Sequence, residues 1–168
     1  AAYLLTHGHM DHLHALADLA DAFPAPILIH PLDLAWAFEP ENESLPFYGP
    51  PRRPSAPFIP IENDQLFELA GLTFRILHTP GHTPGGVCYY FEKEGLLLTG
   101  DTLFRDSVGR TDLEGADPHQ LAASLRRLAT LPPETRVLSG HGEETTLGRE
   151  LRYNPFLREF AGRSQSRR

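Results

Sequence analysis

The sequence predicts an α/β fold (α+β in some schemes) in a single domain that covers residues 1–168. A length of 168 residues and a hydrophobic content of 40% are typical of one globular domain. Short apolar runs typical of strands alternate with segments whose apolar residues recur at helical spacing. A histidine or an aspartate follows four of the predicted strands, and α/β folds build their sites where loops leave the carboxyl ends of strands. These observations predict both the fold class and the place of its functional site.

The first part of the chain is predicted to form two strands and two helices. Residues 2–6 form a short apolar strand, and residues 11–23 form a helix whose apolar face carries Leu13, Leu16, Leu19, Ala20 and Phe23. Residues 25–30 form a second strand, and a proline opens a short helix over residues 31–38. Residues 39–60 are dense in proline, which predicts a long ordered loop.

Two hairpins, a helix and a last strand are expected next. Residues 65–69 and 72–79 form the first hairpin, and residues 85–101 form the second, with a turn around the sequence EKEG. Residues 117–131 form an amphipathic helix with Asp117 as its N-cap, followed by a strand over residues 135–140.

The C-terminal region is predicted to close with a helix. The segment that starts at residue 145 is helical until Pro155. Residues 162–168 (GRSQSRR) form a disordered tail.

The segment THGHMDH, residues 6–12, holds four ligand-type side chains in the register His-x-His-x-Asp-His: His7, His9, Asp11 and His12. A polar surface turn needs no such spacing, and a packed core does not gather side chains that are costly to desolvate. Imidazole and carboxylate are common metal ligands. The segment therefore predicts a metal site.

Three further candidates follow predicted strands: His82, Asp101 and His141. Loops that leave neighbouring strand ends converge, so these side chains are expected to meet the first four. Seven ligands exceed the needs of one tetrahedral ion and suit two ions about 3.5–4 Å apart that share a carboxylate.

At this point the sequence resembles the metallo-β-lactamase superfamily, in particular its short glyoxalase-II-like branch. The segments THGHMDH, HTPGHTPGG, GDTLFRDSVGRTD and GHGEETTLGRELRYNPF match in order, from Thr6 to about Phe156. The resemblance implies a four-layer αββα sandwich. It also implies that His7, His9 and His82 hold a first metal ion, that Asp11, His12 and His141 hold a second, and that Asp101 bridges them. Zinc is the expected metal, with iron and manganese as alternatives.

The implied activity is hydrolysis of a small-molecule thioester such as S-lactoylglutathione. A hydroxide between the two ions would attack the thioester carbonyl, with Asp11 and Asp101 as the carboxylates of the catalytic centre. In glyoxalase II a basic residue at the position that matches Arg110 touches glutathione. We therefore expect Arg110 and Arg105 to bind substrate, and local salt bridges with Asp106 or Asp112 are an equally good interpretation of both arginines.

Two other functions remain open. The GRTD stretch also resembles persulfide dioxygenases, which use one iron held here by His7, His82 and Asp101. A non-catalytic metal-binding module is the second alternative. A true β-lactamase is disfavoured, because that class lacks an aspartate at the position that matches Asp101.

The chain departs from the family in two respects. The family normally has roughly fifty residues of strands and one helix before its first histidine motif, so the resemblance implies that the N-terminal strands are missing and that a longer version would be more stable. Glyoxalase II also carries a C-terminal helical domain that helps to bind glutathione, and this chain stops soon after NPF. The oligomeric state is expected to be a monomer or a homodimer.

Composition excludes several other classes. A net charge of −7 with scattered basic residues argues against nucleic-acid binding, and no apolar run or signal peptide indicates a membrane or secreted protein, so we expect a cytoplasmic location. Cys88 lies in an apolar run and is expected to be buried and inert. Phe47 and Tyr48 could line a substrate cleft, but we expect them to pack with their loop on the core instead. The remaining histidines are expected to have structural roles: His14, His30, His78 and His119.

Overall fold

The computed structural model of this protein describes residues 1–158, and the expected disordered tail, residues 162–168, lies outside them. The elements follow one another along the chain in the order β1 (Tyr3–Leu4), α1 (Met10–Leu13), α2 (Leu16–Ala22), β2 (Ile27–Ile29), α3 (Pro31–Leu34), β3 (Phe58–Pro60), β4 (Leu66–Leu69), β5 (Leu72–His78), β6 (Val87–Phe91), β7 (Leu96–Gly100), β8 (Leu103–Phe104), β9 (Ser107–Val108), α4 (Pro118–Leu128), β10 (Arg136–Ser139), β11 (Thr145–Thr146) and α5 (Leu147–Tyr153).

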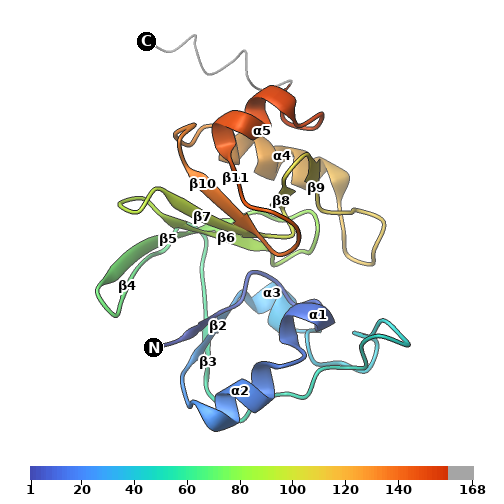
Figure 1. Ribbon diagram of the computed structural model, residues 1–168. Coiled ribbons are helices and arrows are strands. Elements are labelled where there is room, and N and C mark those ends of the chain that lie inside the picture. Colours follow the sequence, from blue (N-terminus) through green and yellow to red (C-terminus); the bar gives the residue numbers. More distant parts are fainter. Residues whose placement is uncertain (159–168) are drawn as a thin grey trace.

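Two sheets form the centre of the fold. The smaller sheet has the order β1-β2-β3 and is parallel, whereas the larger has the order β11-β10-β7-β6-β5-β4. Within the larger sheet only the β10–β7 pair is parallel. Strands β8 and β9 form a separate short hairpin. Figure 1 shows α4 and α5 above the larger sheet and α1, α2 and α3 around the smaller one.

Alternating side chains of the larger sheet divide the core into layers. On strand β6, Cys88 and Tyr90 face the core that α4 and α5 cover, whereas Tyr89 and Phe91 face the core between the two sheets. A third group of buried residues packs the small sheet against α1 and α2, and it includes Leu5, Leu13, Leu16, Ile27 and Ile29. The predicted four-layer αββα sandwich is therefore confirmed.

The predicted elements are correct in outline, with three corrections. The single helix expected over residues 11–23 is two short helices separated by a turn at residues 14–15. Leu19 and Phe23, placed on its buried face, are exposed, because the short α2 turns only one side to the core. The loop expected over residues 39–60 ends in β3, where Pro60 is tolerated because this strand lies at the edge of the small sheet.

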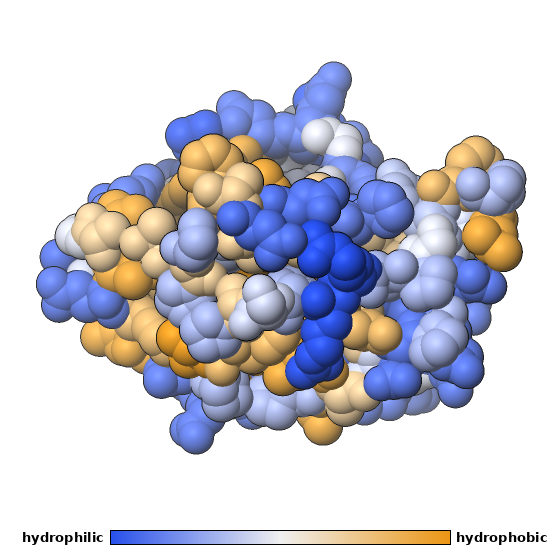
Figure 2. Space-filling model, turned by 90° about the horizontal axis from the view of Figure 1, so that it is seen from below, coloured by the Kyte–Doolittle hydropathy of each residue, from blue (hydrophilic) through white to orange (hydrophobic). Residues whose placement is uncertain are grey.

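The lower surface of the molecule is mixed in polarity. Figure 2 shows hydrophobic residues exposed toward both ends of this face and a strongly hydrophilic band between them. Among the exposed ion pairs of the chain, Arg52 pairs with Asp18 and Asp21 on α2. Within residues 1–158, none of the helices has the length and apolar character needed to cross a bilayer.

Candidate metal centre

Four loops that leave strand ends bring the seven predicted ligands together. His7 and His9 follow β1, and Asp11 and His12 lie in the first turn of α1. The other three follow β5, β7 and β10, and they are His82, Asp101 and His141. Because β7 and β10 are parallel neighbours, their carboxyl ends open on the same edge of the larger sheet.

The loops approach so closely that one position needs glycine. A Cβ atom on Gly140 would lie 2.3 Å from Asp101 Oδ1 and 2.7 Å from His12 Cε1. Any larger residue there would push the carboxylate and the imidazole apart. Glycine before His141 thus permits the close approach of the β7 and β10 loops.

The ligand atoms form three overlapping groups, of which two share no residue and the third, made of His7, His12 and Asp101, links them. His7, His9 and His82 make up the buried half-site, in which His9 Nδ1 lies 3.0 Å from His82 Nε2. Asp11, His12 and His141 make up the outer half-site, in which His141 Nε2 lies 3.1 Å from Asp11 Oδ2.

Asp101 lies between the two half-sites. Its Oδ1 is 3.4 Å from His12 Nε2, and its Oδ2 is 3.6 Å from His82 Nε2 and 3.5 Å from His141 Nε2. Two nitrogen ligands of a tetrahedral zinc ion, each about 2.0–2.1 Å from the metal, are about 3.3 Å apart. The observed spacings therefore fit side chains that share cations.

Unpartnered buried atoms also indicate a cation site. His7 Nε2, His12 Nε2 and Asp101 Oδ1 are buried and have no hydrogen-bond partner among residues 1–158. The opposite ring nitrogen of two ligands is already engaged, since His7 Nδ1 contacts Thr6 Oγ1 at 3.1 Å and His82 Nδ1 donates to the Arg110 carbonyl at 2.9 Å. These contacts turn both Nε2 atoms toward the centre, as in metal-binding histidines.

The electrostatic environments of the two half-sites differ. Burial, together with neighbouring histidines, lowers the pKa of His7 well below its usual value and that of His9 to about 4. Burial also opposes charge on His12, but the carboxylates of Asp101 and Asp11 outweigh it and raise the His12 pKa. Burial would raise the pKa of Asp101, yet His12 and other nearby histidines lower it. The metal-free centre therefore holds neutral imidazoles at its base and an ionised carboxylate in its middle.

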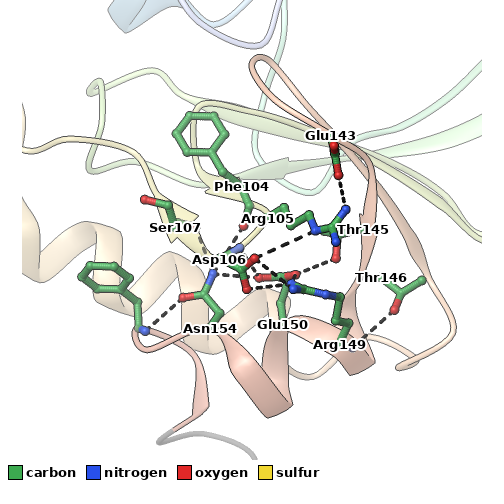
Figure 3. Close-up of polar contacts among 11 residues, drawn as sticks. Phe104, Arg105, Asp106, Ser107, Glu143, Thr145, Thr146, Arg149, Glu150 and Asn154 are labelled. Carbon is green, nitrogen blue, oxygen red and sulfur yellow. Dashed lines mark hydrogen bonds and ion pairs between the residues drawn. The ribbon is translucent and has the colours of Figure 1, made fainter.

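The two predicted substrate-binding arginines form local ion pairs. Arg110 donates to Asp112 through Nε at 2.6 Å and through Nη2 at 2.7 Å. Arg105 pairs with Glu143, and its Nε lies 3.9 Å from Asp106 (Figure 3). The arginine side chains remain partly exposed, so these pairs leave them within reach of a solute.

The remaining histidines lie outside both half-sites. His14 is exposed and its ring packs 5.6 Å from that of Tyr48, whereas His30 and His78 stack on each other with centroids 4.5 Å apart. His119 is exposed on α4.

Two other expectations concern the burial of side chains. Cys88 is buried, as expected, and burial raises the pKa of its thiol to about 11. The expectation that Phe47 packs on the core is wrong: its side chain is 80% exposed, at the tip of a turn that Ser44 and Tyr48 close.

Sequence analysis did not single out three polar residues that contact the ligand loops. Asn42 donates to the carbonyl of Gly8 at 2.8 Å, and Asp33 and Glu150 are fully buried carboxylates. An aspartate in the first turn of a short helix is ordinary, so Asp33 carries no signal in one sequence. Glu150 lies within the matching segment GHGEETTLGRELRYNPF, which is the only signal that pointed to it.

Comparison with known proteins finds one family model and several curated relatives. The model of the "Metallo-beta-lactamase superfamily" matches residues 2–141. A "Probable metallo-hydrolase YqgX" of Bacillus subtilis is 38% identical over 165 residues, which are 95% of this chain and 77% of that protein. The "Hydroxyacylglutathione hydrolase GloC" of Haemophilus influenzae is 36% identical over 159 residues, with 92% and 74% covered.

Several solved structures are similar to this chain in both sequence and fold. TTHA1623 "in a di-iron-bound form" is 49% identical with a TM-score of 0.82, covering 93% of this chain and 77% of the other. BLEG-1 "B3 metallo-beta-lactamase" is 42% identical with a TM-score of 0.86, covering 93% and 76%. ETHE1 from Myxococcus xanthus is 27% identical with a TM-score of 0.73, covering 99% and 68%.

Proposed function

This chain belongs to the metallo-β-lactamase superfamily, and on that basis we propose that it is a binuclear metallohydrolase that cleaves thioesters such as S-lactoylglutathione. The observation that carries the proposal is the pair of ligand groups with Asp101 between them. The relative named hydroxyacylglutathione hydrolase GloC supports the substrate class.

The residues present fit two divalent ions. Such ions would supply a Lewis acid for the substrate carbonyl and would make hydroxide available at neutral pH. His7 and His9 are already neutral at that pH, so they bind a cation without first releasing a proton. Asp11 and Asp101 return two negative charges to the centre, which leaves it positive toward a developing oxyanion.

The proposed reaction needs neither a general acid nor a side-chain nucleophile from the rest of the chain. A thiolate is a good leaving group, so no dedicated general acid is needed. Cys88 is buried with a raised pKa and takes no part as a nucleophile. Thr6 and the Arg110 carbonyl orient the Nε2 atoms of His7 and His82 toward the centre.

Zinc is our first choice of metal, because nitrogen and carboxylate oxygen suit it well. The same donors suit iron and manganese, and TTHA1623, 49% identical, has been solved in a di-iron form. Two ions per chain is the essential part of the proposal.

A persulfide dioxygenase is the second candidate, because the GRTD stretch resembles that branch of the family. A persulfide dioxygenase would need one iron held by His7, His82 and Asp101. His12 and His141 would then have no role as ligands. The similarity to BLEG-1 adds β-lactam hydrolysis as an activity to measure alongside.

His141→Ala separates these candidates. We expect wild-type protein to hold two metal ions and to hydrolyse S-lactoylglutathione, and the variant to lose one ion and several powers of ten in rate. His14→Ala is the matched control, because His14 is exposed and outside both half-sites. Metal analysis, thioester hydrolysis, oxygen uptake with a persulfide and nitrocefin turnover are measured on all three proteins.

One iron per wild-type chain, with oxygen uptake and no thioester turnover, would exclude the hydrolase. A fully metallated protein that is inert in all three assays would support the non-catalytic module instead.

A further inference from the structure

We propose that two buried carboxylates act as positioning residues for the metal centre, Asp33 for the buried half-site and Glu150 for the outer half-site together with Asp101. The proposal rests on the proposed function in one respect: it requires a centre with two ions. Neither carboxylate belongs to the ligand groups themselves.

Asp33 joins the two loops of the buried half-site. Its side chain is fully buried, and its Oδ2 accepts hydrogen bonds from Gly8 N at 2.9 Å and Thr83 Oγ1 at 2.7 Å. Its Oδ1 accepts from Gly85 N at 2.6 Å. Gly8 lies between His7 and His9, and Thr83 directly follows His82. One carboxylate therefore fixes the backbone beside all three ligands.

The fit around Asp33 is tight. A Cβ atom on Gly85 would lie 2.6 Å from Asp33 Oδ1, so this loop approaches the carboxylate closely only because residue 85 is glycine. Burial of a carboxylate is costly unless its hydrogen bonds are satisfied. Burial raises the pKa of Asp33 despite its three hydrogen-bond donors. The loss of hydration therefore outweighs these hydrogen bonds, and the buried position is costly for the ionised carboxylate.

Glu150 joins the segments that follow two of the other ligands, Asp101 and His141. Its Oε1 accepts from Thr145 Oγ1 at 2.5 Å and Arg149 Nη1 at 2.7 Å, and its Oε2 accepts from Asp106 N at 2.8 Å and Asn154 Nδ2 at 3.0 Å. Figure 3 shows these donors converging on Glu150 from the β8–β9 turn, from β11 and from α5.

Further contacts extend the Glu150 network toward the ligands. Asn154 Nδ2 also donates to the carbonyls of Phe104 and Ser107, and Arg149 donates to both carboxylate oxygens of Asp106 at 2.8 and 2.9 Å. Arg105, on the same turn, pairs with Glu143, which follows His141 closely in sequence. The network thus ties the segment after Asp101 to the segment after His141.

The two carboxylates differ in how close their hydrogen-bond donors lie to the ligands. Two of the three donors to Asp33, Gly8 and Thr83, are adjacent to ligands, whereas the donors to Glu150 lie further along the chain from Asp101 and His141. We therefore expect Asp33 to have the larger effect on metal affinity.

Asp33→Asn and Glu150→Gln test the proposal, and each is the control for the other, because both neutralise a fully buried carboxylate and nearly preserve its shape. Zinc is titrated into metal-free protein, and the side-chain ¹⁵N shifts of the ligand histidines report which half-site fills. Asp33→Asn should weaken zinc binding at His7, His9 and His82 by about 10- to 100-fold, the range seen when a partner behind a ligand is lost. Glu150→Gln should weaken binding at His12 and His141, by a smaller factor.

We expect the melting temperatures of both metal-free variants to fall. Loss of stability alone would therefore weaken both half-sites in both variants, and it cannot explain a variant that weakens one half-site selectively. If either variant does not fold, Thr83→Val and Thr145→Val each remove one hydroxyl donor and should show the same selectivity more weakly. Wild-type protein that binds two zinc ions, with variants that weaken both half-sites equally or neither, would overturn the positioning roles and leave the proposed function standing. Wild-type protein that binds fewer than two ions would overturn both.

Discussion

The two halves of the metal centre share one carboxylate but differ in nearly every other respect. In the buried half-site His7 is 3% exposed, and the imidazoles of His7 and His9 are neutral because burial and neighbouring histidines lower their pKa values. In the outer half-site the His141 side chain is 57% exposed, and the carboxylates raise the pKa of His12. The buried half-site is therefore shielded from solvent and holds neutral ligands, whereas the outer half-site is more open to solvent.

Removal of the shared carboxylate should produce the largest effect, because it affects both half-sites at once. Asp101→Ala takes away the group within 3.6 Å of His12, His82 and His141. We expect binding of both ions to weaken and thioester hydrolysis to fall by several powers of ten. Metal analysis and rate measurement check this, with Asp18→Ala as an exposed control on α2. Two retained ions with near-normal turnover would mean that Asp101 does not bridge.

The single tryptophan offers a separate view of the buried half-site. Trp36 packs against His9 with ring centroids 5.4 Å apart, and the chain has no other tryptophan. A paramagnetic cobalt ion held by His7, His9 and His82 should quench most of its fluorescence. His82→Ala should abolish this quenching, whereas His141→Ala should preserve it. Equal quenching in both variants would show that cobalt does not distinguish the half-sites.

The sequence reveals the candidate ligands of both half-sites far better than it reveals the residues that support them. His7, His9, Asp11 and His12 stand out because ligand types crowd into one segment, and Asp101 and His141 because each follows an apolar strand. Asp33 gives no such signal, since its role depends on contacts with Gly8 and Gly85, which are distant in sequence. Only the folded chain brings them together.

The fold shows the same contrast between strong and weak patterns. The hairpins around β5, β6 and β7 are correctly predicted because their strands are long and apolar. Strands β8, β9 and β11 have two residues each, too few to show a period of two. The break between α1 and α2 is invisible because Leu13 and Leu16 keep helical spacing across it.

A smaller effect, on substrate binding, is expected from substitution of Arg110. Arg110 is exposed, although Asp112 pairs with it in the free protein. If Arg110 binds a carboxylate of the thiol carrier, Arg110→Ala should raise KM by about tenfold and leave kcat and metal content nearly unchanged, the signature of lost uniform binding. Arg52→Ala is the matched control, because Arg52 also pairs with exposed aspartates, far along the chain from the ligands. An unchanged KM would leave Arg110 with its local ion pair alone.

The smallest expected effect is a difference in how pH acts on the two supporting carboxylates. Burial raises the pKa of Asp33 above its usual 3.8, so its contribution to stability is fully present below that value and is lost as pH rises through the raised pKa. Burial opposes ionisation of Glu150 as well, but hydrogen bonds from Thr145, Asp106 and other donors lower its pKa below 4.5. Its contribution is therefore present above pH 4.5 and is lost as pH falls through the lowered pKa.

Denaturant unfolding of metal-free protein between about pH 3 and pH 7 measures both contributions. The difference in unfolding free energy between wild type and Glu150→Gln should shrink on acidification, whereas the difference between wild type and Asp33→Asn should grow. The opposite slopes follow from which influence prevails at each carboxylate, desolvation at Asp33 and hydrogen bonding at Glu150. Parallel slopes would mean that Asp33 and Glu150 lie in equivalent environments. The proposed difference between them, with desolvation prevailing at Asp33 and hydrogen bonding at Glu150, would then be wrong.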